Sequence, residues 1–173
     1  VYNMKDYKQY EIMAPVGCYE SLTAAIKGGA DSIYFGIEGL NMRSRSSNNF
    51  SLQDLRQIAG TCQKYEVKSY LTVNTIIYDD DINYMQTIID AAKEAKVSAV
   101  IVADVAAMMY AHSIGVEVHL STQLNITNIE SLKFYAQFAD VVVLARELNL
   151  DQVKMIHEQI VEQNIKGPKG KLI

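Results

Sequence analysis

One unit recurs along the chain: a short apolar segment, a polar loop, and an amphipathic helix that leads into the next apolar segment. The apolar segments are rich in Val, Ile and Tyr, which is typical of β-strands. The predicted strands are Glu11–Pro15, Ser32–Gly36, Lys68–Asn74, Ser98–Asp104, Val116–Gln123 and Val141–Arg146. Strands that alternate with helices through short joins pair in parallel. This repetition therefore restricts the chain to an open doubly wound sheet or a (βα) barrel.

Signals at the helix ends agree with this division. Ser51, followed three residues later by Asp54, predicts a helix start at an N-cap. The run Asp79–Asp81 places negative charge at the start of the next helix, where it complements the helix dipole. Gly28 and Gly29 predict the end of the first helix.

The polarity of the predicted strands favours the barrel. In the segment Val116–Gln123, Val118 and Leu120 point to one face, whereas Glu117 and His119 point to the other, because side chains alternate along a strand. A parallel strand in a doubly wound sheet is usually apolar on both faces. A strand with one polar face is better explained by a barrel whose interior carries functional groups. The predicted fold class is therefore α/β, a parallel TIM-type (βα) barrel.

The predicted barrel is incomplete. A full barrel of this type has eight units and about 250 residues. The 173 residues supply six units, and Lys171–Ile173 is the expected start of a seventh strand. We therefore expect residues 1–173 to form a single domain, the N-terminal part of a barrel whose C-terminal remainder is missing. Because an unfinished barrel exposes two strand edges, self-association into a homo-oligomer is a further expectation.

Composition limits the cellular setting and the partners. The formal net charge of −4 gives no bulk attraction for nucleic acid. No run of about 18 apolar residues predicts a membrane span, and the first residues lack the apolar core of a secretory signal. Cys18 and Cys62 form no Cys-x-x-Cys pair, which indicates reduced thiols in a cytoplasmic protein. We expect no membrane association and no metal held by this chain alone.

Polar residues gather where the predicted strands end. In parallel barrels the active site lies at the C-terminal ends of the strands. The predicted substrate-binding residues are Arg43, Arg45, Asn74, Asp104, Ser121, Gln123, Asn125 and Arg146. Arginine binds carboxylates and phosphates through paired hydrogen bonds, so the expected ligand is a peptide or a small anionic substrate.

Each of these predictions has a simpler alternative. Asn74 and Asp104 are equally suited to capping the helix or turn that follows them. Two arginines in a polar loop, such as Arg43 and Arg45, are equally consistent with solvated side chains. Arg146 and its neighbour Glu147 also fit a surface ion pair, which contributes little to stability.

Three residues are candidates for acid–base chemistry: Glu11, His119 and Glu147. The alternation places Glu11 and His119 on the interior face, where an acid and an imidazole would pair and perturb each other's protonation. A buried imidazole that only satisfies the core is the alternative for His119. No nucleophile elbow, phosphate-binding loop or zinc-protease helix is present, so the residues alone specify no reaction.

Five short motifs resemble one known family. They are Met13–Gly17, Gly29–Asp31 leading to Tyr34–Gly36, Leu71–Asn74, His119–Gln123 and Leu144–Leu148. In this order and spacing the chain resembles the collagenase-like peptidases, peptidase family U32, over nearly its whole length. The resemblance implies a catalytic barrel in a protease (hydrolase) family of unknown catalytic type.

The same resemblance implies an alternative function. Several members of the family are similar to factors for oxygen-independent hydroxylation of tRNA, rRNA or a quinone precursor. Such factors hold an iron–sulfur cluster through cysteines, and those that act on RNA need prephenate. The corresponding cysteines would follow a His-Gly-Ala-x-Cys segment beyond Ile173, and neither Cys18 nor Cys62 matches them. We therefore expect no cofactor in this fragment, and a cluster or an RNA partner only in a full-length parent. A non-catalytic scaffold fragment is the third alternative.

Overall fold

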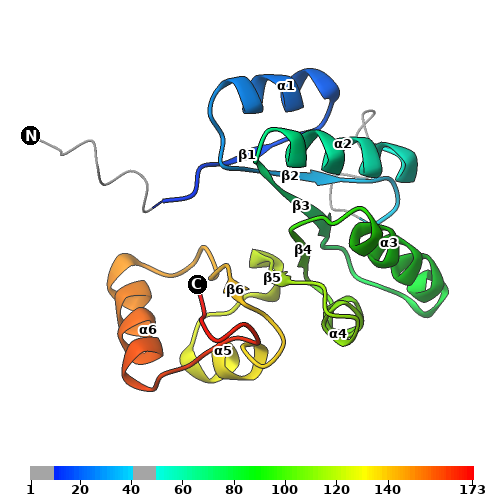
Figure 1. Ribbon diagram of the computed structural model, residues 1–173. Coiled ribbons are helices and arrows are strands. Elements are labelled where there is room, and N and C mark those ends of the chain that lie inside the picture. Colours follow the sequence, from blue (N-terminus) through cyan, green and yellow to red (C-terminus); the bar gives the residue numbers. More distant parts are fainter. Residues whose placement is uncertain (1–9, 41–49) are drawn as a thin grey trace, which may run out of the picture.

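The computed structural model describes residues 10–40 and 50–173. Its centre is a parallel sheet of six strands in the order β1-β2-β3-β4-β5-β6. The strands are β1 (Met13–Pro15), β2 (Ser32–Gly36), β3 (Lys68–Val73), β4 (Ala99–Val102), β5 (Val118–Leu120) and β6 (Val141–Val142). They follow one another around an arc, with helices outside it, so the sheet is a curled half-barrel (Figure 1). The predicted incomplete parallel barrel is confirmed.

Helices connect successive strands. They are α1 (Tyr19–Lys27), α2 (Leu52–Lys64), α3 (Ile82–Glu94), α4 (Val105–Ser113), α5 (Ile129–Tyr135) and α6 (Leu150–Glu162), with short 3₁₀ turns η2 (Asp79–Asp81) and η3 (Thr122–Leu124). The predicted helix signals are confirmed. Ser51 caps α2 by accepting a hydrogen bond from the Asp54 amide, while the Asp54 carboxylate accepts one from the Ser51 amide. Lys27 is the last residue of α1 and Gly28 caps it.

The sheet has one apolar face and one face of mixed polarity, and side chains alternate between them along each strand. Leu71, Val100, Val118 and Leu120 lie on the face that packs against the helices, and each is at most 1% exposed. Tyr70 and the residues in register with it point to the opposite, concave face. The hydrophobic core therefore lies between the sheet and the helices, and the concave face carries the polar side chains of Tyr70 and His119 beside Ala99 and Ile101.

The predicted strands five and six are too long. Strand β5 ends at Leu120 because the Ser121 hydroxyl caps the turn η3, which bends the chain away from the sheet. Beyond Leu120, β5 therefore offers β6 no further residue to pair with. After the Val143 amide bonds to the Leu120 carbonyl, the Ala145 amide bonds instead to Ile126, in the segment after η3.

The chain begins a seventh strand position at its C-terminus. The Ile173 amide donates to the Asp140 carbonyl at 3.0 Å, and the Val142 amide donates to the Ile173 carbonyl at 2.8 Å. Two bonds from one residue to the neighbours of Val141 are the pattern of a parallel ladder. Ile173 therefore continues the sheet beyond β6, where the sequence predicts a seventh strand to start.

Among the helices of the described residues, none combines the length and the apolar character that a membrane span requires.

The core between sheet and helices predicts a clear contrast in stability. Ile88 on α3 is fully buried, whereas Leu150 at the start of α6 is 87% exposed. We expect Ile88→Ala to lower the free energy of unfolding by about 2–5 kcal/mol, because it leaves a cavity. Leu150→Ala should change it by less than about 0.5 kcal/mol. Urea denaturation followed by circular dichroism measures both, and equal effects would contradict this placement of the core.

Candidate functional site

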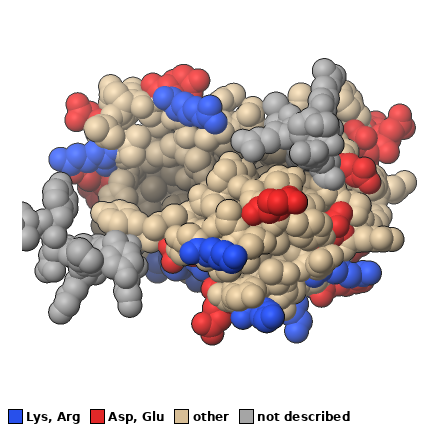
Figure 2. Space-filling view, turned by 90° about the horizontal axis from the view of Figure 1, so that it is seen from above, with Lys and Arg blue, Asp and Glu red and all other residues tan. Residues whose placement is uncertain are grey.

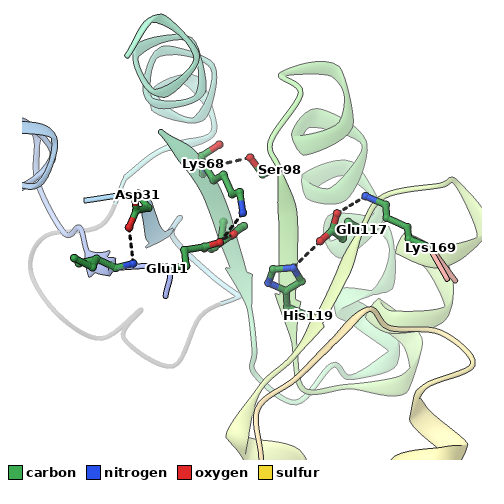
Figure 3. A network of polar contacts seen from close by, with 10 residues as sticks. Glu11, Asp31, Lys68, Ser98, Glu117, His119 and Lys169 are labelled. Carbon is green, nitrogen blue, oxygen red and sulfur yellow. Dashed lines mark hydrogen bonds and ion pairs between the residues drawn. The ribbon is translucent and has the colours of Figure 1, made fainter. Parts of the chain in front are cut away.

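The concave face of the sheet carries two arms of polar side chains (Figure 3), and the Tyr70 ring of the first arm lies against the His119 ring of the second. In the first arm Glu11, just before β1, contacts Lys68 and Tyr70 on β3. In the second arm His119 on β5 contacts Glu117, which in turn contacts Lys169 from the C-terminal segment. The arms come from segments far apart in the sequence and meet because parallel pairing brings β3, β4 and β5 side by side.

In the first arm Glu11 is an ionised acceptor. Its carboxylate accepts from the Tyr70 hydroxyl at 2.5 Å and from Lys68 Nζ at 2.5 Å. Burial by itself raises the pKa of Glu11, but the bonds from Lys68 and Tyr70 outweigh it and hold that pKa below its usual 4.5. Burial and the adjacent carboxylate raise the pKa of Tyr70 well above its usual 10.0. At neutral pH Tyr70 is therefore a hydrogen-bond donor to Glu11.

In the second arm Glu117 divides its two oxygens between two partners. Oε1 lies 2.9 Å from His119 Nε2, and Oε2 contacts Lys169 Nζ. Burial raises the pKa of Glu117, but the bonds from Lys169 and His119 outweigh it and lower that pKa below 4.5. An ionised carboxylate can only accept, so Nε2 of His119 carries the proton in this contact. In the neutral ring Nδ1 then has a free lone pair.

The His119 ring is buried, but only one of its two nitrogens has a hydrogen-bond partner among the described residues. Its centre lies 4.7 Å from that of Tyr70, with 56° between the ring planes. The two rings come from strands on either side of β4, where Ala99 pairs with Tyr70 and Ile101 pairs with His119. The side chain of His119 is 9% exposed, yet within the described part of the chain Nδ1 has no hydrogen-bond partner. His119 therefore keeps one unused proton acceptor on the concave face.

The pairing of Glu11 with His119 expected from the sequence is not formed. Each acid has its own partners, and Tyr70 lies between Glu11 and the imidazole. The strand alternation already placed Glu117 on the face of His119, but the sequence identified neither Glu117 nor Tyr70 as a site residue. The contact between Lys169 and Glu117 spans 52 residues and left no local signal.

The predicted residues at the strand ends lie above this network, towards the C-terminal ends of the strands. Asp104 caps α4 by accepting from the Ala106 amide at 2.8 Å, and it also accepts from Ile77. Ser121 is buried and caps η3, with Gln123 exposed beside it. Asn125, also exposed, ends η3 in a left-handed conformation. Asp104 and Ser121 thus hold the loops in place, whether or not they also bind a ligand.

The remaining predicted residues are less closely tied to the network. Asn74 is half-buried directly after β3. Arg146 and Glu147 are exposed in a turn beyond β6, and no ion pair joins them in the residues that the structure covers. Arg43 and Arg45 lie outside the described residues. Substrate binding by these side chains stays a prediction.

The cysteines present do not suit an iron–sulfur cluster. Cys62 is buried within α2, where burial raises its thiol pKa to about 11. Cys18 lies at the start of α1, with its sulfur 3.5 Å from the Ser21 hydroxyl. Across residues 10–40 and 50–173, no three His, Cys, Asp or Glu side chains are grouped as metal ligands. These residues therefore do not form a cluster site.

One face of the molecule is hollowed. Figure 2 shows a deep hollow lined mainly by uncharged residues, with lysine, arginine and acidic side chains at its border. A lining with few charges and a border with many suits a ligand that is held in the hollow and oriented at its edge.

The lowered pKa values of Glu11 and Glu117 predict acid-sensitive stability. Because both carboxyls bind protons less readily in the folded chain, their contribution is complete above the usual pKa of 4.5. It is lost as the pH falls below 4.5 through the lowered values. The free energy of unfolding, from urea denaturation, should therefore fall between about pH 5 and pH 3. The double variant Glu11→Gln, Glu117→Gln should show a shallower decline. The exposed Glu158→Gln is the control, and an equal slope in all three proteins would refute the assignment.

Known proteins resemble this chain in both sequence and fold. The profile of peptidase family U32 matches residues 17–166. A collagenase of Porphyromonas gingivalis is 71% identical over 161 residues, covering 93% of this chain and 39% of the collagenase. The 23S rRNA 5-hydroxycytidine synthase of Escherichia coli is 35% identical over 86% of this chain and 22% of its own length. This chain thus spans about two-fifths or less of these relatives.

A solved structure described as a U32 peptidase shares the fold. It superposes with a TM-score of 0.71 over 86% of this chain and 64% of its own, at 14% identity. Identity at that level supports the fold alone. The family profile and the collagenase relative each cover most of this chain, and the chain therefore belongs to peptidase family U32.

Proposed function

We propose that this chain forms the N-terminal part of the catalytic barrel of a collagenase-like peptidase, and that His119 transfers the proton during peptide hydrolysis. The observation that carries the proposal is the unused Nδ1 of His119, opposite an Nε2 that an ionised Glu117 holds at 2.9 Å. A buried imidazole with a purely structural role usually has both nitrogens bonded. An acid that fixes one nitrogen and leaves the other free is the arrangement of a general base.

Water is the nucleophile that this arrangement suits. No serine, threonine or cysteine of the described residues is hydrogen-bonded to His119, so no nucleophile–base pair is formed. In the proposed step His119 Nδ1 takes a proton from water, and the oxygen attacks the peptide carbonyl carbon. When the C–N bond breaks, the imidazolium returns that proton to the leaving amine. Glu117 stays ionised throughout and stabilises the imidazolium between these two transfers.

The ends of the strands are the proposed binding region for the peptide. Ser121 directly follows β5 and lies at its C-terminal end, two residues after His119. Asn74 and Gln123, with Arg146, follow the ends of three strands around the same border. A peptide bound there would present a carbonyl to the imidazole below.

Hydroxylation of RNA is a second candidate because the rRNA 5-hydroxycytidine synthase is 35% identical to this chain. For that function the arginines at the border would bind an anionic co-substrate such as prephenate. The chain's own cysteines do not fit an iron–sulfur cluster, so a cluster would need ligands from elsewhere in a longer protein. The net charge of −4 also leaves RNA binding to a local surface or another domain.

The two functions predict different consequences of removing the imidazole. In the complete gene product that contains this chain, His119→Gln should lower kcat for cleavage of gelatin or a fluorogenic collagen peptide by about 100-fold or more, as loss of a general base does. The exposed His157→Gln on α6 is the matched control and should keep full activity. The rate of peptide cleavage, measured on metal-free and highly purified protein, tests both variants.

Two outcomes would contradict the peptidase proposal. One is full cleavage by His119→Gln, and the other is no cleavage by the unchanged protein. In the second case, mass spectrometry of nucleosides from a deletion strain decides whether hydroxylated cytidine or uridine is lost, which would support the RNA candidate.

A further inference from the structure

Lys169 stands in a turn whose backbone is held independently of the lysine side chain. The Lys169 amide donates a hydrogen bond to Asp140 Oδ1 at 2.7 Å. Asp140 is buried, with 6% of its surface exposed. The Gly167 amide donates to the Lys171 carbonyl and the Gly170 amide to the Gly167 carbonyl. On the far side of the turn, Ile173 pairs with the sheet beside β6.

Gly167 allows this turn to lie directly against the chain before β6. A Cβ atom at position 167 would come within 2.5 Å of the Ala139 carbonyl oxygen and 2.9 Å of the Asp140 Cα. Both atoms belong to backbone, which cannot move aside cheaply. The close approach of glycine to Ala139 and the bond from Asp140 thus place the Cα of Lys169 at one position beside β5 and β6.

A lysine that starts from a fixed backbone position can hold its partner at a smaller loss of entropy. An exposed ion pair usually contributes little, because two long side chains must be ordered. Here Glu117 is the shorter and more buried partner, with 24% of its side chain exposed against 58% for Lys169. Glu117 is also tied at its other oxygen to His119. Two partners on separate oxygens fix both the position and the plane of the carboxylate.

We propose that Lys169 is a positioning residue, which holds the Glu117 carboxylate in the orientation that keeps the Nε2–H of His119 bonded and its Nδ1 facing the concave surface. The catalytic consequence rests on the proposed function, but the coupling of Lys169 to His119 through Glu117 does not. Lys169 has no contact with the imidazole itself among the described residues, so it acts only through Glu117.

The charged groups around the imidazole define what Lys169 contributes. Glu117 and Tyr70 face His119 directly, while Glu11 and Lys68 lie behind Tyr70. Lys68 already holds Glu11 on that side. Lys169 is therefore the ammonium that acts on the Glu117 side, and its removal should leave the contacts of Glu11 with Lys68 and Tyr70 in place. This separation makes the effect of one lysine measurable.

The direct test is the stability of the Nε2–H bond in the complete gene product. ¹⁵N-histidine labelling shows the His119 imidazole proton by NMR, with His119→Gln used to identify the signal. In Lys169→Met we expect this proton to exchange with water about fivefold faster. This factor corresponds to the loss of an ion pair whose stabilisation lies at the upper end of the range for exposed pairs. Lys169→Arg should restore slow exchange. Lys171 lies in the same turn and forms no ion pair within the described residues, so Lys171→Met is the control.

The catalytic consequence has a separate readout. Lys169→Met removes a positive charge that disfavours an imidazolium beside Glu117, so the acid limb of kcat for peptide cleavage should move to higher pH. KM should stay the same, because Lys169 lies away from the strand ends that bind the peptide. A lysine that only stabilises the fold would lower the yield or thermal stability without moving the pH profile.

The possible outcomes separate the two proposals. Unchanged proton exchange in Lys169→Met, or no protected imidazole proton in the unchanged protein, would overturn the role of Lys169. Faster exchange without any cleavage activity would support the coupling and contradict the peptidase function. Faster exchange in Lys171→Met to the same extent would also overturn the proposal, because it would show a general effect of charge.

Discussion

The structure depends on one constraint: in a parallel sheet that curves, alternate side chains along every strand must serve two different environments. The face of Leu71, Val100 and Val118 packs under the helices and supplies the core. The opposite face does not pack against the helices, and it carries Tyr70 and His119. Parallel pairing sets β3, β4 and β5 side by side, so residues distant in the sequence become neighbours across the concave surface.

That division explains why the paired charges of the sheet lie on its concave side. The two carboxylates Glu11 and Glu117 are each bonded to a lysine and to one side chain with a ring. A partly buried carboxylate is tolerated only when it is paired and hydrogen-bonded, and both of these are. The side chains of Lys68 and Lys169 are more than half exposed, so their charges remain hydrated while the acids are held in place.

Much of the fold was predictable because its signals are local. The six strands, the cap at Ser51 and the glycine stop after Lys27 can each be read from a few neighbouring residues. The ends of β5 and β6 were not, since Leu120 is followed by a tight turn that competes with strand extension. A hydroxyl that caps a turn and a hydroxyl that points from a strand look the same in sequence.

The site was predictable only in part, for a physical reason. Alternation placed His119 and Glu117 on the interior face, but it could not tell which of the nearby acids the imidazole would bond. Glu117, on the same strand face, is the one that bonds it, while Glu11 is taken by Lys68 and Tyr70. The contribution of Lys169 follows from tertiary packing at Gly167 and Asp140, which no local pattern records.

The central claim is that His119 bears its proton on Nε2 and keeps Nδ1 free. The imidazole ¹⁵N chemical shifts, measured above the pH at which the ring is charged, report which nitrogen carries the hydrogen. We expect the Nε2–H form for His119, with a scalar-coupled proton on Nε2 and none on Nδ1. A ring protonated on Nδ1, or an equal mixture of both forms as in a solvated histidine, would contradict it.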